Sequence, residues 1–175
     1  MNATALLREQ LQAAGWLLAE TVKDVTPEQA HRAPDGKAHP IGALYAHTLI
    51  GVDFAINGLG RGGPLLIMGE WGAKAGLSEP PPQDSSADWT EWGRRVRVDL
   101  NALGGYAKAL LDGADSFLAG LNDADLDRKV ELPFAGFGPQ SLGWIVSNVA
   151  LGHLHNHTGE ISALKGVQGG KGYPF

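Results

Sequence analysis

The segment Trp92–Leu121, WGRRVRVDLNALGGYAKALLDGADSFLAGL, carries the clearest helical pattern of the chain. Its apolar residues recur at intervals of three or four positions, and they are Trp92, Val96, Leu100, Leu103, Ala107, Leu110, Ala114, Phe117 and Leu121. Because an α-helix turns by about 100° per residue, this spacing places them all on one face. The segment therefore predicts one core-facing helix of about eight turns, with a bend at Gly104 and Gly105.

Similar patterns elsewhere predict three further long helices and one short one. The long helices are expected over residues 3–23, 40–58 and 141–165, the last with Gly166 as its C′ residue. Thr26-Pro27-Glu28-Gln29 matches a capping box with Pro at N1 and predicts a short helical turn. A short strand could form at 129–132. We therefore expect an all-α four-helix bundle. It forms one domain over 1–175, with a long crossover loop at about 59–86 and an irregular tail at 167–175.

The composition is that of an ordinary globular domain and excludes several classes of function. Hydrophobic residues make up 43% of the chain and charged residues 19%. The formal net charge of −5 argues against a nucleic-acid interface, which needs a basic face. The absence of cysteine excludes disulfides, thiolate ligands and a cysteine nucleophile. Neither a membrane-spanning apolar run nor a signal peptide is apparent, so we expect a cytoplasmic protein.

Two histidines, His153 and His157, are separated by four positions in the stretch 150–166, ALGHLHNHTGEISALKG. Side chains at i and i+4 lie nearly one above the other, and this pair shares its helical arc with apolar residues. His47 occupies a similar apolar stripe on the helix expected over 40–58. Buried polar groups need partners, so three inward imidazoles from two helices predict a site for Zn²⁺, Ni²⁺ or Fe²⁺. Three protein ligands leave positions for water or substrate, which is typical of catalytic sites.

Two neighbours of the histidine pair have different expected roles. Glu160 lies on the same arc one turn further on. It could accept a hydrogen bond from a ligand imidazole, act as a base, or lie partly exposed near the end of the helices. His155 points about 200° away from His153, toward polar residues, and is not expected to be a ligand.

Four other features do not add to the expected site. His39 precedes Pro40 and is expected to help cap the helix that follows. Asp53 lies about 120° from the direction of His47 and is left out of the site. Residues 58–63 match G-x-G-x-x-G by letter, but they follow a helix, whereas a dinucleotide site needs a preceding strand. Trp71, in the long loop, is the tryptophan best placed to line the mouth of a pocket.

With these residues in place, the chain resembles the DinB/YfiT-like superfamily of four-helix proteins, whose name comes from DNA-damage induction. The family pattern has one histidine in the second helix, here His47 in ALYAHTLIGVDF, and His-x-x-x-His in the last helix. The second of that pair is commonly followed by x-Gly-Gln-Ile. Here the residues are Thr158-Gly159-Glu160-Ile161, with Glu160 where Gln is usual. The ending LKGVQGGKGYPF also resembles this group, and the similarity covers nearly the whole chain.

The resemblance implies an up-down-down-up bundle, often dimeric, with a divalent metal at one end held by His47, His153 and His157. Characterised relatives include thiol S-transferases and a thiol-dependent isomerase. We therefore expect an enzyme, with zinc or nickel, that transfers a low-molecular-weight thiol to an electrophilic small molecule. Glu160 would orient a ligand or move a proton. Two alternatives remain: a metal-dependent hydrolase, and a non-catalytic metal- or small-ligand-binding protein of a stress response.

Overall fold

Helices dominate the computed structural model, which describes residues 2–83, 89–132 and 136–175. The α-helices are α1 (Ala3–Val22), α2 (Pro27–His31), α3 (Ile41–Asp53), α4 (Trp89–Arg95), α5 (Leu100–Ala119), α6 (Leu142–Trp144) and α7 (Gly152–Val167). Two π-helical segments, η1 (Phe54–Gly60) and η4 (Ile145–Leu151), and two 3₁₀ turns, η2 (Leu66–Met68) and η3 (Asp123–Asp127), complete the helical elements. The strands β1 (Lys129–Val130) and β2 (Gln140–Ser141) pair antiparallel. The described residues are therefore mostly helical, which agrees with the predicted all-α class.

Most of the predicted helices form, with small changes at their ends. In α2, Thr26 and Gln29 make both hydrogen bonds of the capping box. The helix expected over 40–58 consists of α3 continued by η1, so Gly58 and Gly60 lie within a helix. The last helix runs through α6, η4 and α7, and its C′ residue is not Gly166. Gly169 has this role, with φ 82°, and the amide of Gly170 donates to the carbonyl of Lys165.

The prediction of one continuous helix over 92–121 is wrong, because the chain is extended between α4 and α5. The amide of Val98 donates to Nε2 of His31, and the amide of Asp99 donates to the carbonyl of Gly76. Leu77 and Val98 form an isolated antiparallel bridge. Asp99 then caps α5 with its carboxylate. Long-range backbone pairing therefore replaces one turn of the expected helix.

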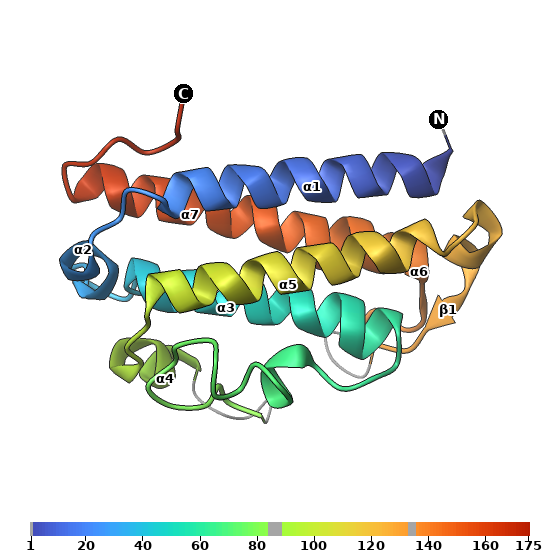
Figure 1. The fold of residues 1–175 in the computed structure, drawn as a ribbon, viewed down its shortest axis with the longest axis horizontal. Coiled ribbons are helices and arrows are strands. Elements are labelled where there is room, and N and C mark those ends of the chain that lie inside the picture. Colours follow the sequence, from blue (N-terminus) through green and yellow to red (C-terminus); the bar gives the residue numbers. More distant parts are fainter. Residues whose placement is uncertain (1, 84–88, 133–135) are drawn as a thin grey trace.

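The long helices lie side by side but do not all run in the same direction (Figure 1). From the N-terminus α1 runs toward α2, α3 and α5 run the opposite way, and α7 runs parallel to α1. α1 packs against α5 and α7, and α3 packs against the same two helices. The described part of the expected loop, up to Gln83, holds η2 and crosses from η1 toward α4, whereas 84–86 lie outside the described residues. No helix in the described ranges has the length and apolarity that a membrane crossing requires.

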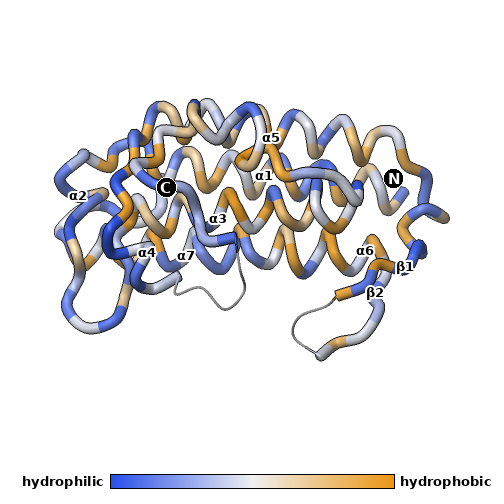
Figure 2. The backbone as a smooth tube through the Cα atoms, turned by 90° about the horizontal axis from the view of Figure 1, so that it is seen from below, coloured by the Kyte–Doolittle hydropathy of each residue, from blue (hydrophilic) through white to orange (hydrophobic). Residues whose placement is uncertain are grey.

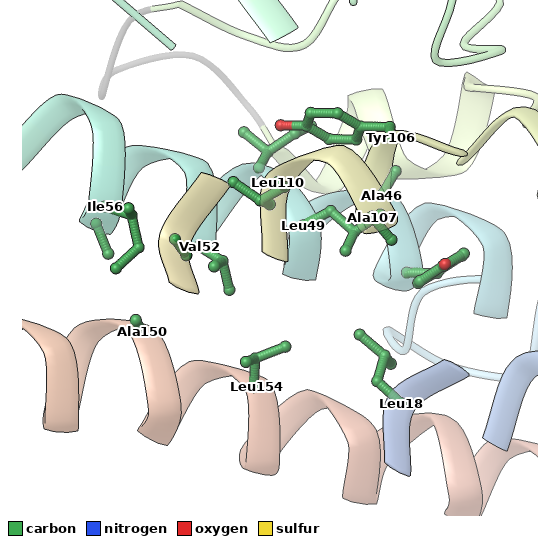
Figure 3. Packing of buried hydrophobic residues seen from close by; sticks show 14 of the residues in the cluster. Leu18, Ala46, Leu49, Val52, Ile56, Tyr106, Ala107, Leu110, Ala150 and Leu154 are labelled. Atoms are coloured by element: carbon green, nitrogen blue, oxygen red, sulfur yellow. The ribbon is translucent and has the colours of Figure 1, made fainter. Parts of the chain in front are cut away.

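The core lies between these helices, and Figure 2 shows apolar positions recurring along each of them. Figure 3 shows Leu49, Leu110 and Leu154 meeting in the centre, and all three are fully buried. Leu18 of α1 closes the same cluster. Burial of such side chains stabilises the fold by about 1.5–3 kcal/mol each.

A buried carboxylate fastens the long loop to this core. Asp53 is fully buried and accepts hydrogen bonds from the hydroxyl of Tyr106 (2.6 Å) and the side-chain amide of Asn57 (2.7 Å). It also accepts from the backbone amides of Leu66 and Ile67, at 3.1 and 2.9 Å. Four donors compensate the cost of burying its oxygens. The start of η2 is therefore held in a fixed position beside α3.

Candidate metal centre

Three histidines from α3 and α7 converge beside the core. His47 comes from α3, and His153 and His157 come from successive turns of α7. One ligand nitrogen of each lies within 4.8 Å of those of the other two. The ring centroids are 5.0 Å apart from His47 to either partner and 4.3 Å apart between His153 and His157. The predicted convergence of these three rings is therefore present in the structure.

The phase of the last helix places the pair at the edge of the core. Leu154 and Thr158 are the buried residues of this turn, and the hydroxyl of Thr158 donates to the Leu154 carbonyl. His153 and His157 lie one position earlier and are half-buried. His155 is exposed, as predicted. The histidines thus border the core on one side and open space on the other.

Gly51 allows α3 and α7 to approach each other closely beside the ring of His153. A Cβ built on Gly51 would lie 2.1 Å from Nε2 of His153 and 2.6 Å from its Cδ2. Real Cβ atoms are not found at such distances, so any side chain at position 51 would displace the ring. Gly51 therefore provides the space in which His153 faces His47.

Burial keeps two of the imidazoles neutral at physiological pH. Desolvation lowers the pKa of His47 to about 4, and the nearby His153 and His157 act in the same direction. Desolvation likewise lowers the pKa of His153 to about 4, with a further contribution from His157. A neutral imidazole has a free lone pair, which is the form that binds a metal ion.

Two hydrogen bonds fix the orientation of the histidine rings on α7. Nδ1 of His157 lies 2.5 Å from a carboxylate oxygen of Glu160, one helical turn away. When Nδ1 donates to this carboxylate, Nε2 carries the lone pair. Nε2 of His153 lies 3.3 Å from the carbonyl oxygen of His47. Metal-binding histidines commonly donate their second N–H to a carboxylate or a carbonyl in this way.

His47 carries a buried nitrogen that suits a metal ligand. Its Nδ1 atom is buried, and it has no hydrogen-bond partner among the residues that the structure describes. An unpaired buried polar atom is costly and calls for an explanation. Together with the neutral rings and the short separations between nitrogens, this atom makes the group fit a divalent cation.

Two cavities meet at His47 and differ in character. One, of about 270 Å³, is the more polar of the two, because His39, His157 and Glu160 line it together with apolar residues such as Leu44 and Trp92. The other, of about 670 Å³, is lined mainly by apolar side chains from α3, η1 and the long loop. Trp89 lines both cavities, and its ring meets the ring of His47 edge-on with centroids 5.0 Å apart.

Some residues of this region lie elsewhere than the sequence predicts. Trp71 does not reach these cavities and packs on Tyr106, with ring centroids 5.8 Å apart. Trp89 has the role expected of Trp71. His39 does not bond to the helix end as a cap and instead lines the polar cavity. Asp53 lies outside the histidine group, as predicted, and holds the loop.

A mostly helical fold with a three-histidine group defines a candidate metalloprotein. The profile of the DinB superfamily matches residues 10–161, and the chain belongs to this superfamily. The crystal structure of a conserved protein from Enterococcus faecalis has a similar fold, with a TM-score of 0.80 over 97% of this chain and 99% of that chain. The two sequences are 22% identical, so this likeness concerns the fold. Among curated proteins, none matches the chain.

Proposed function

We propose that this protein is a divalent-metal-dependent enzyme that transfers a low-molecular-weight thiol to an electrophilic small molecule. The observation that carries the proposal is the convergence of His47, His153 and His157 beside two cavities. Three protein ligands would leave room for an exchangeable ligand, as in catalytic rather than structural zinc sites. Zinc and nickel are the ions that we propose, because neutral imidazoles bind both.

The nucleophile that we propose is the thiol of a cosubstrate, because the chain itself has no cysteine thiol. The 175 residues include no cysteine, so a sulfur nucleophile has to come from a cosubstrate. A bound divalent cation lowers the pKa of a coordinating thiol and so supplies thiolate at neutral pH. The thiol sulfur then forms a bond to the electrophilic carbon. The displaced electron pair leaves with a leaving group or, in an addition, takes up the proton.

The chain's own residues have distinct roles in this proposal. Glu160 accepts a hydrogen bond from Nδ1 of His157 and orients that ring. His39 and Glu160 line the polar cavity, where they can bind the polar end of a thiol cosubstrate. Trp89 packs against His47 and limits the movement of its ring.

A metal-dependent hydrolase is the second candidate. Glu160 borders the polar cavity, and a carboxylate there can accept a proton from water. The contact between Glu160 and His157 favours the orienting role, because the same carboxylate is already engaged by the ring. Thiol transfer is therefore the preferred proposal.

We propose the up-down-down-up four-helix bundle as the architecture of the protein, supported by the opposed directions of α1 and α7 against α3 and α5 (Figure 1). A homodimer in the cytoplasm, without nucleic-acid or membrane partners, remains a prediction from the family resemblance and the net charge of −5.

Turnover with defined thiols tests the proposed activity. Two samples are compared: protein loaded with zinc or nickel, and protein stripped of metal by a chelator. Each is incubated with 2-mercaptoethanol and a panel of electrophiles, and with esters as substrates for hydrolysis. We expect the thioether to form only with metal present. His47→Ala should abolish its formation, and His155→Ala should leave it unchanged. Ester hydrolysis without thioether formation would support the hydrolase instead. No turnover, with ligand binding that survives metal removal, would favour the non-catalytic alternative.

A further inference from the structure

The larger cavity beside the histidines has the size and lining of a small-molecule pocket. Its volume of about 670 Å³ lies within the range of about 300–1,000 Å³ that is usual for such pockets. Its wall includes Ile50, Phe54, Leu65, Ile67, Met68 and Trp89. Among the described residues that line it, none is Asp, Glu, Lys or Arg. A charged ligand would find no side chain of opposite charge among these described residues to compensate its lost hydration.

The apolar cavity and the polar cavity share one wall. His47 and Trp89 border both, whereas Glu160 and His157 border only the polar one. A molecule in the apolar cavity therefore reaches the histidine group at His47, through a space that Glu160 does not line. Two reactants could then approach His47 through separate cavities, the polar one beside Glu160 and the apolar one beside Ile50.

The loop wall of the cavity is held in place before any ligand binds. The backbone amides of Leu66 and Ile67 donate to the buried carboxylate of Asp53, and Leu65 and Met68 flank this pair. The hydroxyl of Tyr106 also donates to this carboxylate. A preformed wall lowers the ordering cost of binding, which favours a ligand site over a surface that forms only on contact.

We propose that this cavity binds the apolar, uncharged part of the electrophilic substrate, so that substrates with an aromatic or alkyl tail are preferred. This inference rests on the proposed thiol transfer at the histidine group. It adds a substrate class: small, neutral electrophiles whose reactive carbon lies next to His47 and whose tail lies between α3 and η2.

Binding of unreactive analogues tests the cavity without any turnover. N-benzylpropanamide and N-methylpropanamide share the amide and differ only in the tail. We expect the benzyl compound to bind about tenfold more tightly by calorimetry, because burying an aromatic ring contributes at least that much. Metal-stripped protein should show the same preference. Equal binding of the two amides would overturn the proposal.

Two variants locate this preference in the cavity. Met68 is 46% exposed, and Leu6, on α1, is 44% exposed and serves as a matched control. Met68→Glu places a carboxylate at the rim and Leu65→Ala removes part of the wall, so each should reduce the benzyl preference about fivefold. Leu6→Glu should leave it unchanged. A preference retained in both cavity variants would overturn the proposal.

A turnover measurement distinguishes failure of the apolar site from failure of the proposed thiol transfer. The reactive counterparts are N-benzylacrylamide and N-methylacrylamide, with 2-mercaptoethanol as the thiol. In this addition, sulfur bonds to the terminal alkene carbon and the π electron pair takes the thiol proton to the adjacent carbon. We expect kcat/KM to be about tenfold higher for the benzyl compound. Tail-dependent binding without turnover of either acrylamide would support the apolar site and overturn the proposed thiol transfer.

Discussion

The imidazole of His153 lies directly against the backbone of Gly51, where a Cβ would be 2.1 Å from Nε2. The colliding atoms belong to a side chain that can rotate, so Gly51→Ala should keep the fold and displace the ring. We expect a loss of divalent-metal affinity on the order of 10- to 100-fold, as when groups that orient a ligand are removed. Titration of stripped protein with Zn²⁺, alongside circular dichroism, measures both effects.

Gly104 on α5 is the matched control, because a Cβ there would meet no atom within 4 Å. Gly104→Ala should leave metal affinity unchanged and raise the free energy of unfolding by about 0.5–1 kcal/mol. Normal metal binding by Gly51→Ala would contradict the role given to this glycine.

The carboxylate of Glu160 should govern the ring of His157, to which it is hydrogen-bonded at 2.5 Å. Glu160→Ala removes the acceptor, and we expect metal affinity to fall on the order of 10- to 100-fold. Glu160→Gln retains an acceptor oxygen without the charge. Its metal affinity should lie between those of the unaltered protein and of Glu160→Ala. Competition with a chelator measures the affinities, and Glu9→Gln on α1 is the surface control. Equal affinities in all four proteins would contradict the assignment.

The stability of the metal-free protein should fall as the pH falls from about 6.5 to 4. In the folded protein the pKa of His47 and that of His153 are lowered to about 4 from the ordinary 6.5. Between these values the unfolded chain binds more protons, so acid favours unfolding. The loss is on the order of 3 kcal/mol for each imidazole. Urea unfolding with a chelator, repeated at each pH, measures the free energy of unfolding.

A double variant assigns this pH dependence to the histidines. His47→Ala/His153→Ala should flatten the fall between pH 6.5 and 4, whereas the exposed His155→Ala should not. An unchanged slope in the double variant would mean that other groups cause it. Binding of a divalent cation should also remove the slope in the upper part of this range, because it holds the imidazoles unprotonated.

The hydroxyl of Tyr106 donates to the buried carboxylate of Asp53 at 2.6 Å, and its loss should destabilise the protein. Hydrogen bonds to charged groups contribute about 1.5–3 kcal/mol, so Tyr106→Phe should lower the free energy of unfolding by about that amount. Tyr173→Phe, in the irregular tail, should change it little. Thermal and urea unfolding of the two variants provide the comparison, and equal effects would argue against the anchoring role of Asp53.

Local periodicity predicted the helices well and failed where distant segments pair. The apolar face of 92–121 is real, since Trp92, Val96 and Leu103 are all buried. The break at Val98 depends on His31 and Gly76, whose positions in space no local pattern gives. Asp99 before an apolar run was the one local sign of a new helix start.

The histidine group could be predicted because i, i+4 spacing and an apolar stripe are properties of one helix. The exact burial of these histidines could not be predicted. The prediction assumed about 100° per residue throughout the helix, whereas η4 is π-helical from Ile145 to Leu151. The wider turns shift the phase, so Leu154 faces the core and His153 and His157 lie half-buried at its edge. Trp89 and His39 come from other segments and had no sequence pattern linking them to His47.

Metal content tests the three-histidine centre most directly. Purified protein, dialysed and analysed by elemental mass spectrometry, should contain about one divalent ion per chain. His47→Ala, His153→Ala and His157→Ala should each lose most of it, whereas His155→Ala, two residues from either α7 histidine, should retain it. An ion content that is the same in His153→Ala as in the unaltered protein, or that falls equally in His155→Ala, would contradict the three-histidine centre.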